Sequence, residues 1–397
     1  MNRNTVEYLF GSENIRVVSK APFTRETCEF LDALSKALRK DERARLYPDI
    51  QTFAFWIRKA NIQSIKKKEF GLDCRMGKGL IFHVAPSNVP VNFAYSLVFG
   101  MLAGNSNIIK ISSKKHIQSR IICSIMDFLS EKSEFSWVKE QNAVVAYGRG
   151  QSEKTDAFSA ACDMRIIWGG DPAIAQIRKS LLQPRSTEIT FADRYSIALM
   201  GVDAIVNASD QEMLVLAQNF YNDTYLMDQN ACSSPHMVVW TGEREYKEQA
   251  EIRFWDAVYG YAASRYDLAD MKVSEKYTLL CELAVMFPIL KLHRYENILY
   301  IVEIEHLVEN VAQLRGKFGL FFSCFVDGID HFVRYMDDKK VQTCTIYGID
   351  AKRILDCMLR SHIRGIDRIV PIGKAMDIGV VWDGYDLMNT LSRRIEC

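Results

Sequence analysis

The stretch that decides the fold runs over residues 79–111. It reads Gly79-Leu-Ile-Phe-His-Val84, then Ala85-Pro-Ser-Asn-Val-Pro90, an apolar segment from Val91 to Leu102, and Asn107-Ile-Ile-Lys-Ile111. The first run is typical of a buried strand, and the last predicts a second strand. Pro90 suits the first turn of a helix over 91–102, and Gly104 suits its carboxyl-terminal cap. A strand, a helix and a strand in about 33 residues indicate a parallel βαβ unit.

The same alternation continues along the chain. Residues 1–69 are expected to be mostly helical. Further strands are predicted over 143–147, 164–168, 187–191, 196–200, 237–240, 320–326 and 341–347, and helices over 116–129, 154–160, from Pro172, and over 209–222 and 243–265. This pattern is typical of parallel sheets with helices on both faces, so the predicted fold class is α/β. Ligands of such sheets bind beside the carboxyl ends of the strands, where the turns at 86–90, 112–115 and 169–170 are expected.

Composition limits the classes of function. The chain has 397 residues, 48% of them apolar, and its 50 basic and 49 acidic side chains nearly cancel. No overall field attracts nucleic acid or an acidic membrane surface. The first residues lack the apolar core of a signal peptide, and no run of about 18 apolar residues suggests a membrane span. We therefore expect a cytoplasmic protein that neither binds nucleic acid nor spans a membrane.

Common metal and phosphate motifs are missing. The ten cysteines include no Cys-x-x-Cys pair, and the histidines show no His-x-x-x-His spacing. These spacings argue against a structural zinc site and a disulfide framework, so we expect no metal. The Gly-x-Gly-x-x-Gly and Gly-x-x-x-x-Gly-Lys-Ser/Thr fingerprints are absent too, so any phosphate binding takes another form.

One cysteine stands on a short polar connection. The segment Asp228-Gln-Asn-Ala-Cys-Ser-Ser-Pro235 lies between a helical pattern ending near Tyr225 and a strand-like run from Met237. A thiol among small polar residues at such a position can be reached by a substrate and can act as a nucleophile. Free cysteines are more often buried structural residues, and this segment alone leaves both interpretations open.

Several separated motifs together resemble a known family. The stretches that carry the resemblance to the aldehyde dehydrogenase superfamily are His83-Val-Ala-Pro-Ser-Asn-Val-Pro90 and Ala103-Gly-Asn-Ser-Asn-Ile-Ile-Lys110. Further stretches make the chain more similar to the acyl-CoA reductase family, which includes the fatty acid reductase subunit of bacterial luminescence; these are Asp228 to Pro235, Asp367-Arg-Ile-Val-Pro-Ile-Gly-Lys374 and Val381-Trp-Asp-Gly-Tyr-Asp386. The resemblance extends from about residue 23 to residue 396.

The resemblance implies a domain organisation. It predicts two doubly wound α/β domains with parallel sheets and a small oligomerisation element, and hence a homo-oligomer. We expect a cofactor-binding domain over 1–200, with a pairing hairpin near 70–82. A catalytic domain carrying the nucleophilic cysteine is expected over 201–375, followed by a tail over 376–397 that pairs or packs.

Two catalytic residues follow from the resemblance. Cys232 corresponds to the nucleophile that takes the acyl group from a thioester, a reaction suited to a thiolate. Asn88 corresponds to the residue whose amide, with a backbone N–H at the nucleophile, holds the oxyanion. An alternative role for Asn88 is to cap the helix that follows Pro90.

The resemblance also implies a cofactor site. Lys110 corresponds to the lysine that contacts the cofactor ribose, and Ser87 lies in the turn beside it. Where NAD-preferring relatives often carry a glutamate, this chain has Ser113, followed by Lys114. Serine and lysine can donate to a 2′-phosphate, which favours NADPH, although lysines in a loop are also commonly just solvated. Gly169 and Gly170 would let backbone N–H groups approach the pyrophosphate.

The chain departs from hydrolytic aldehyde dehydrogenases at the water-activating base. Those enzymes place a glutamate where this chain has Thr190, and Glu188 is two residues away. Without that base, water should attack an acyl-enzyme slowly, and hydride transfer can release an aldehyde. Another departure is Asp171, whose carboxylate beside a phosphate is unfavourable unless it turns inward to cap the next helix.

These observations predict an NADPH-dependent reductase that converts a fatty acyl thioester, on CoA or an acyl-carrier protein, to a fatty aldehyde through Cys232. Two alternatives remain open. One is an oxidising, NAD-dependent aldehyde dehydrogenase, against which Thr190 and Ser113 argue. The other is an acyl-carrying subunit of a fatty acid reductase complex, which receives its acyl group through an acyl-protein synthetase or acyltransferase partner.

Overall fold

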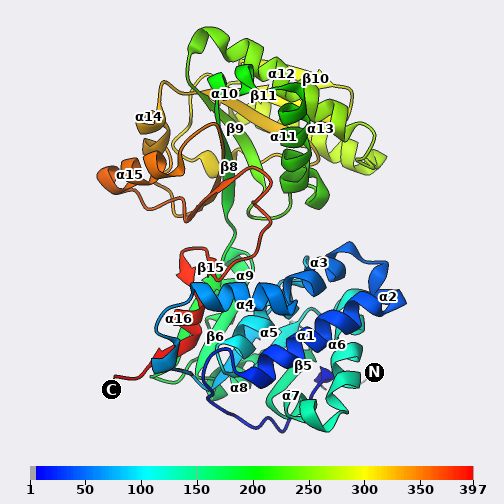
Figure 1. The fold of residues 1–397 in the computed structure, drawn as a ribbon. Coiled ribbons are helices and arrows are strands. Elements are labelled where there is room, and N and C mark those ends of the chain that lie inside the picture. The colour runs from blue at the N-terminus through cyan, green and yellow to red at the C-terminus, as the bar shows by residue number, and fades with distance from the viewer. Residues whose placement is uncertain (1–5, 149, 397) are drawn as a thin grey trace. The chain divides into compact units, whose positions relative to one another are not determined.

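The computed structural model describes residues 6–148 and 150–396 (Figure 1). These residues form two compact units. The first contains the described residues up to Ala192 together with those from Tyr385 onward, and the second is Asp193–Gly384. The sequence placed the first boundary at residue 200, but the strand Tyr195–Gly201 already belongs to the sheet of the second unit, so the chain crosses earlier. The predicted tail over 376–397 is divided between the units at Gly384.

A six-stranded sheet forms the centre of the first unit, in the order β1-β5-β4-β3-β6-β7. All neighbouring strands are parallel except the edge strand β1, which runs antiparallel to β5. The strands are β1 (Glu7–Phe10), β3 (Leu80–Val84), β4 (Ser106–Ile111), β5 (Asn142–Ala146), β6 (Met164–Trp168) and β7 (Thr187–Phe191). The sequence did not predict β1, because four residues are too few to show a period.

Helices surround this sheet. They are α1 (Arg25–Lys40), α2 (Glu42–Arg45), α3 (Pro48–Trp56), α4 (Lys59–Lys68), η1 (Leu72–Cys74), α5 (Asn92–Leu102), α6 (Ile117–Ser130), η2 (Ser133–Phe135), α7 (Ser136–Gln141), α8 (Ser152–Ala161), α9 (Asp171–Ile177) and α16 (Leu387–Leu391). Around 70–82, where a pairing hairpin was expected, β2 (Arg75–Gly77) pairs antiparallel with β17 (Ser392–Arg394) from the end of the chain. The remaining short strand of this unit is β16 (Tyr385–Asp386).

Strand β3 shows why this sheet needs helices on both faces. All five of its residues are buried. Phe82 packs in an apolar cluster with Ile174 of α9 and, at its margin, Phe158 of α8. On the opposite face, the His83 ring bonds to the Ser96 hydroxyl of α5 at 2.7 Å and to the Asn107 amide oxygen of β4 at 3.0 Å. Such burial on both faces is the property of a parallel strand inside a doubly wound sheet.

A seven-stranded sheet forms the second unit, in the order β10-β11-β12-β9-β8-β13-β14. Here too one edge strand, β10, is antiparallel and the other neighbours are parallel. The strands are β8 (Tyr195–Gly201), β9 (Pro235–Thr241), β10 (Lys291–Tyr295), β11 (Leu299–Glu303), β12 (Leu320–Phe325), β13 (Val341–Tyr347) and β14 (Arg368–Pro371), with β15 (Val381–Trp382) near the boundary. The predicted α/β class with two parallel, helix-covered sheets is confirmed.

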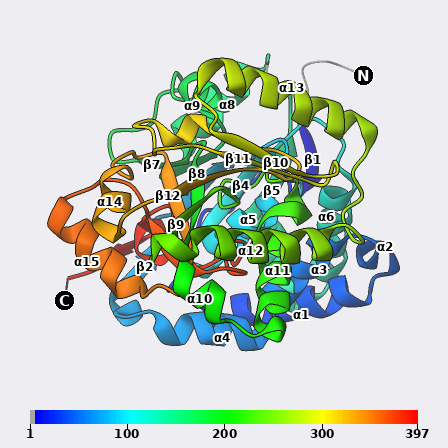
Figure 2. The same ribbon diagram turned by 90° about the horizontal axis from the view of Figure 1, so that it is seen from above.

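Two apolar cores lie on the two faces of this sheet. Helices α11 and α12, which lie side by side, cover one face, and α13, α14 and α15 cover the other (Figures 1 and 2). The helices are α10 (Val202–Asn207), α11 (Asp210–Thr224), η3 (Tyr225–Met227), η4 (Arg244–Tyr246), α12 (Lys247–Ala262), α13 (Asp270–Met286), η5 (Val311–Gln313), α14 (Ile329–Arg334) and α15 (Ala351–Ser361). Ser209 and Glu212 form a capping box at the start of α11. Within the described part of the chain, no helix is long and apolar enough to cross a membrane.

The burial of His83 predicts how the free energy of unfolding depends on pH. Burial lowers the pKa of His83 to about 4, well below its ordinary 6.5. The unfolded chain therefore binds a proton that the folded chain does not, so the contribution of His83 is complete above pH 6.5 and is lost as the pH falls towards 4. In His83→Gln, we expect the slope of unfolding free energy between pH 6.5 and 4 to decrease by up to about 1.4 kcal/mol per pH unit.

Urea unfolding at a series of pH values measures this slope. His306→Gln, the same substitution at an exposed histidine, provides the matched control. A slope in His83→Gln equal to that of the wild type would contradict the prediction.

Candidate active site

Cys232 lies on the short connection between η3 and β9. Two left-handed residues, Asp228 and Gln229, reverse the chain after η3, with φ of 53° and 59°. β9 lies between β12 and β8, inside the sheet. The thiol is therefore placed at the amino end of a central parallel strand, and Cys232 is partly buried there.

Neighbouring strands bring three more polar residues to the same edge of the sheet. Arg194 immediately precedes β8, Gln342 is the second residue of β13, and Asp367 immediately precedes β14. The strands β9, β8, β13 and β14 are consecutive and parallel, so their amino ends meet at one edge. The general rule that ligands bind at carboxyl ends does not locate this cluster.

The loop before Cys232 is held by side-chain hydrogen bonds. The Asp228 carboxylate accepts from the Tyr266 hydroxyl at 2.6 Å and from Lys272 Nζ at 3.0 Å. The buried Gln229 amide accepts from the Gly319 N–H at 2.8 Å and donates to the Leu320 carbonyl at 3.1 Å. Left-handed backbone is uncommon for residues such as Gln229, and these bonds explain how it persists.

The sulfur of Cys232 has a polar neighbourhood. Gln342 Nε2 lies 3.5 Å from Cys232 Sγ and also donates to a carboxylate oxygen of Asp383. The Ser196 hydroxyl donates to the Cys232 carbonyl at 2.7 Å and accepts from the Thr343 N–H at 3.3 Å. Both the side chain and the backbone of Cys232 are thus connected to the start of β13.

The Cys232 thiol keeps its proton at neutral pH. Burial, with the charge of Asp383 as a smaller cause, raises the pKa of Cys232 to about 11, while Gln342 and Arg194 lower it. Burial also raises the pKa of the Asp383 carboxyl to about 6. Arg194 is ion-paired with Asp367. A catalytic role for Cys232 therefore requires donors that stabilise the thiolate.

The motif over 367–374 forms a turn that supports this edge of the sheet. The buried Asp223 carboxylate accepts from the N–H of Gly373 at 2.6 Å and of Ala375 at 3.0 Å. The Asp223 carbonyl accepts from Ser234 Oγ at 2.8 Å, which connects the turn to the cysteine loop. Arg368 donates to the carbonyls of Lys374, Ala375 and Asp377 at 2.7–2.8 Å.

The residues predicted to bind the cofactor all lie in the first unit, at the carboxyl ends of neighbouring strands. Ser87 follows β3, Lys110 is the penultimate residue of β4, Ser113 and Lys114 follow that strand, and Gly169 and Gly170 follow β6. Asn88, which was predicted to be catalytic, lies beside Ser87 on the turn after β3. β4, β3 and β6 are adjacent and parallel, so these turns share one edge of the sheet. The His116 ring bonds to the Ser87 carbonyl at 3.2 Å, which joins two of the turns.

Individual residues of this edge differ in exposure. Ser113, Lys114 and Gly170 are exposed, and Lys110 Nζ lies 5.3 Å from the centre of the Tyr147 ring. An added Cβ at Gly169 or Gly170 would make only ordinary contacts, and neither glycine has a positive φ. The backbone conformation thus does not require glycine here, which leaves close approach of a ligand as a reason for it.

The alternative role of Asn88 as a helix cap is not supported. Helix α5 begins at Asn92, its N-cap is Val91, and that cap makes no side-chain hydrogen bond within the described chain. Asn88 itself is exposed on the turn. Asp171 likewise does not cap α9: it is the first helical residue, and Gly170 occupies the N-cap position.

Two arginine side chains bind the Glu188 carboxylate. Its carboxylate accepts from Arg165 Nε and from Arg178 Nε, each at 2.7 Å. Arg165 is buried, and Glu188 is its direct cross-strand partner in the β6–β7 register. Both oxygens of this carboxylate are therefore engaged by guanidinium groups. Thr190 lies two residues further along the same strand.

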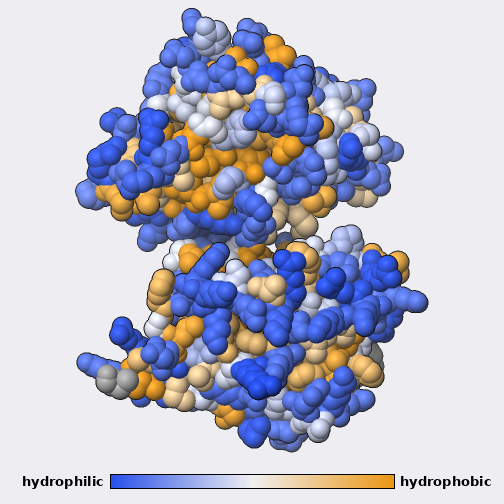
Figure 3. All heavy atoms as spheres, in the orientation of Figure 1, coloured by the Kyte–Doolittle hydropathy of each residue, from blue (hydrophilic) through white to orange (hydrophobic). Residues whose placement is uncertain are grey.

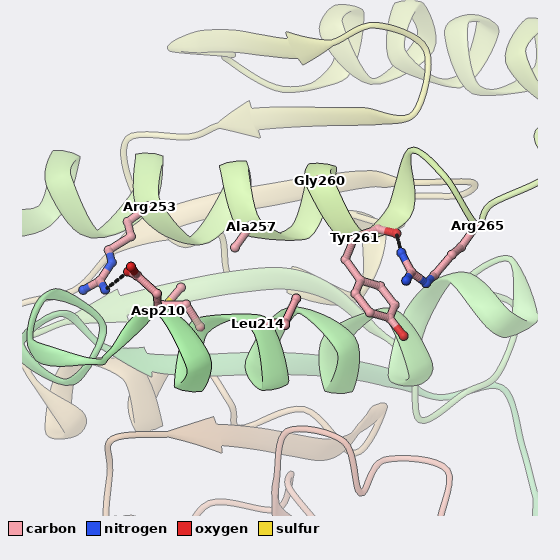
Figure 4. Close-up of a pocket in the computed structure, with 8 residues that line it drawn as sticks. Asp210, Leu214, Arg253, Ala257, Gly260, Tyr261 and Arg265 are labelled. Atoms are coloured by element: carbon pink, nitrogen blue, oxygen red, sulfur yellow. Dashed lines mark hydrogen bonds and ion pairs between the residues drawn. The ribbon is translucent and has the colours of Figure 1, made fainter.

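The second unit also has shallow hollows away from Cys232. One, of about 390 Å³, lies between α11 and α12; Figure 4 shows Leu214 and Ala257 facing each other there, with Arg253 at one end and Arg265 at the other. The Arg253 guanidinium donates to the carbonyls of Ile205 and Val206 at 2.9 and 2.7 Å. Another, of about 360 Å³, is lined by Val215, Ile346, Tyr347 and Ile372. Figure 3 shows apolar atoms gathered on the face of the second unit that is seen in this view.

The described residues contain neither a metal-ligand group nor a disulfide. In the ranges 6–148 and 150–396, no group of three or more His, Cys, Asp or Glu side chains is arranged to hold a metal ion. The cysteines in these ranges are free thiols. His236 is buried and bonds to the Gly316 carbonyl at 3.0 Å, as a structural histidine does.

Two doubly wound units, with a cysteine before a central strand of the second, define an aldehyde dehydrogenase-like protein. The structure is similar to indole-3-acetaldehyde dehydrogenase AldA from P. syringae, solved with NAD+ and IAA (TM-score 0.65, 10% identity, covering 93% of this chain and 82% of that one). It is also similar to aldehyde dehydrogenase 21 from Physcomitrella patens (TM-score 0.64, 12% identity, 93% and 84% covered). These identities show the fold alone.

The family is narrower than the fold. Residues 24–394 match the family model of acyl-CoA reductase (LuxC), and the chain belongs to this family. It is 21% identical over 325 residues to a long-chain acyl-protein thioester reductase of Vibrio harveyi, which covers 80% of this chain. The chain spans 63% of the length of that relative. The resemblance inferred from the motifs is confirmed.

The turn at Gly373 provides a test of the support beneath the site. Gly373 has φ of 92°, and a Cβ there would lie 2.7 Å from Asn219 Cβ. Gly373→Ala combines a left-handed side chain with a clash, so we expect the free energy of unfolding to fall by about 2–4 kcal/mol. Urea unfolding measures the change. Gly379→Ala is the matched control, because a Cβ at Gly379 meets nothing closer than 3.7 Å. Equal losses in the two variants would refute this account of the turn.

Proposed function

We propose that the protein reduces a fatty acyl thioester to a fatty aldehyde with NADPH, through an acyl group carried on Cys232. The observation that carries the proposal is the family match over residues 24–394. Within this range, Cys232 lies on a loop held by hydrogen bonds, and the Gln342 amide donates to its sulfur. The thioester carrier is CoA or an acyl-carrier protein, and the enzyme acts in the cytoplasm as a homo-oligomer.

Acylation exchanges one thioester for another. The Cys232 thiol loses its proton to solvent, and the thiolate attacks the carbonyl carbon. A new carbon–sulfur bond forms, the old one breaks, and the released carrier thiolate takes up a proton. Because a thioester is replaced by a thioester, the step has little thermodynamic cost and an acyl-enzyme can accumulate. The amide of Asn88 is proposed to donate to the oxyanion formed in this step.

The fate of the acyl-enzyme depends on water. In β7, Glu188 is bound by Arg165 and Arg178, and the neighbouring position on that face is Thr190, which is not a base. This arrangement supports slow hydrolysis and release of the acyl group by reduction. An oxidising aldehyde dehydrogenase would need an activated water at this stage.

The edge formed by β4, β3 and β6 fits a phosphorylated dinucleotide. The donors on it are the Ser113 hydroxyl and the Lys114 ammonium group, both exposed, and no carboxylate occurs in residues 110–116. Hydroxyl and ammonium donors suit a 2′-phosphate, whereas a glutamate would repel it. We propose that Lys110 and Ser87 contact the ribose side and that Gly169 and Gly170 leave room for the pyrophosphate. A bound reduced nicotinamide would supply the hydride that converts the acyl group to an aldehyde.

The relative from Vibrio harveyi is named for an acyl-protein substrate. This name supports a partner, such as an acyl-protein synthetase or acyltransferase, that delivers the acyl group to Cys232. Delivery by a partner is compatible with reduction on this chain. A chain that only carries the acyl group is the competing function.

Mass spectrometry with an acyl-CoA series tests the proposed nucleophile. We expect an acyl adduct on the peptide containing Cys232 when NADPH is withheld, and NADPH oxidation with release of aldehyde when it is added. Cys232→Ala should abolish both. Cys281→Ala, which removes an exposed thiol of the same unit, should change neither.

Each contrary result has a defined meaning. An adduct without NADPH oxidation would identify an acyl carrier. Reduction of NAD by added aldehyde, without thioester reduction, would identify an oxidising dehydrogenase. An adduct that persists in Cys232→Ala would refute the proposed nucleophile.

Ser113 provides a test of cofactor choice. Ser113→Glu places a carboxylate where a 2′-phosphate is expected, so we predict that the kcat/KM ratio of NADPH to NADH falls at least about tenfold. Steady-state kinetics with both cofactors measure the ratio. Ser133→Glu adds the same charge at an exposed serine of the first unit and should leave the ratio unchanged. A ratio insensitive to Ser113→Glu would contradict the assignment.

A further inference from the structure

We propose that Gln342 is a catalytic residue that donates an amide N–H to the sulfur of Cys232, and that Asp383 is the positioning residue that holds this amide in its donating orientation. The inference rests on the proposed role of Cys232 as nucleophile. It adds two residues to the site that the motifs did not assign.

The orientation of the Gln342 amide follows from its neighbours. Its Nε2 lies 3.5 Å from Cys232 Sγ and donates to Asp383 as well, and its oxygen accepts from the Thr343 hydroxyl at 3.3 Å. An amide nitrogen carries two N–H groups, so it can serve both the sulfur and the carboxylate. A flipped amide would turn its oxygen towards the carboxylate, placing two acceptors together. Gln342 is 2% exposed, so water cannot easily compensate for such a flip.

The position of the Asp383 carboxylate is set by the backbone. Asp383 has φ of 49° and the following Gly384 has φ of 75°. Consecutive left-handed residues are the conformation that Asp-Gly pairs favour in tight turns. A Cβ on Gly384 would lie 3.0 Å from the Asp367 carboxylate, so the turn is seated against the ion pair of Asp367 with Arg194.

The charged groups around Asp383 and Cys232 already bind other partners. Asp383 faces Arg194, Arg368 and Asp367, and Cys232 faces both of these arginines as well as Asp383. Arg194 is paired with Asp367, and Arg368 is bound by three backbone carbonyls. Within the described chain, Gln342 is the side chain that donates a hydrogen bond to the sulfur.

This arrangement matters for ionisation of the thiol. Burial disfavours the thiolate, and a hydrogen bond to sulfur is stronger when the sulfur is charged, so the Gln342 N–H stabilises the reactive form. The Asp383 charge opposes the thiolate, but it also prevents the amide from turning its oxygen to the sulfur. The two effects of Asp383 can be separated, because only the second acts through Gln342.

A double-mutant cycle on the full-length protein separates them. The measurement is the rate constant for alkylation of Cys232 by iodoacetamide from pH 6 to 10, read on the peptide containing Cys232. We expect Gln342→Met to raise the apparent pKa of the thiol and to slow alkylation at pH 8 about fivefold, the worth of one hydrogen bond. In an Asp383→Gly background, which tolerates the left-handed backbone, the same substitution should change the rate less than about twofold.

Three further variants complete the test. Asp383→Asn keeps a carbonyl acceptor and the turn, so it should retain the full sensitivity to Gln342→Met. The exposed Glu296 has the same φ of 49° in the same unit, and Glu296→Gly should alter nothing at Cys232. If Gln342→Met does not fold, Gln342→Glu, which preserves shape but loses the donor, should slow alkylation in the same direction.

Equal effects of Gln342→Met in the two backgrounds would refute the positioning role of Asp383. An unchanged pH profile in Gln342→Met would refute donation to the sulfur. The assay uses neither acyl substrate nor cofactor, so either failure is distinct from the absence of an acyl adduct.

Discussion

Parallel strands buried on both faces are the constraint on which this structure depends. In β3 and β13 the faces of the sheet are taken up by helices and apolar clusters, so polar chemistry can occur only where strands begin or end. The first unit places its predicted cofactor residues at carboxyl ends. The second places Cys232, Arg194, Gln342 and Asp367 at amino ends. The proposed sites therefore lie at opposite ends of the parallel strands in the two sheets.

The loop between η3 and β9, which carries Cys232, illustrates how such an edge is made rigid. Hydrogen bonds hold it from three directions: from α13 through Lys272, from β12 through Leu320 and from α11 through Asp223. Each partner is a buried or partly buried group whose own hydrogen bonds would be lost if the loop moved. The motif residues over 367–374 contribute to this support rather than to the sulfur itself, since Asp223 and Arg368 bind backbone groups there.

Local pattern predicted most of the elements and the proposed nucleophile Cys232. β6, β7 and β13 begin and end at the predicted residues, and the runs of β6 and β13 are bounded directly by a charged residue on one side and glycine on the other. β1, β10 and β14 were missed, since edge strands bury less and show weaker patterns, and the buried inner strand β11 was missed as well. Gln342 and Asp383 were missed for different reasons. Gln342 stands inside an apolar strand, and nothing in the neighbouring sequence marks such a polar residue as functional. The Asp383-Gly384 pair is typical of a tight turn, but it was interpreted only as part of the motif over 381–386.

The sequence by itself determined the α/β class, the alternation of strands and helices, and the position of Cys232 on a short connection, because these depend on residues close together in the chain. The tertiary structure alone decided that Gln342, more than a hundred residues later, would reach that sulfur. In the second sheet β8 lies between β9 and β13, and its pairing with β13 does not follow chain order. That order is set by the packing of both faces against helices, a long-range property that no local pattern records.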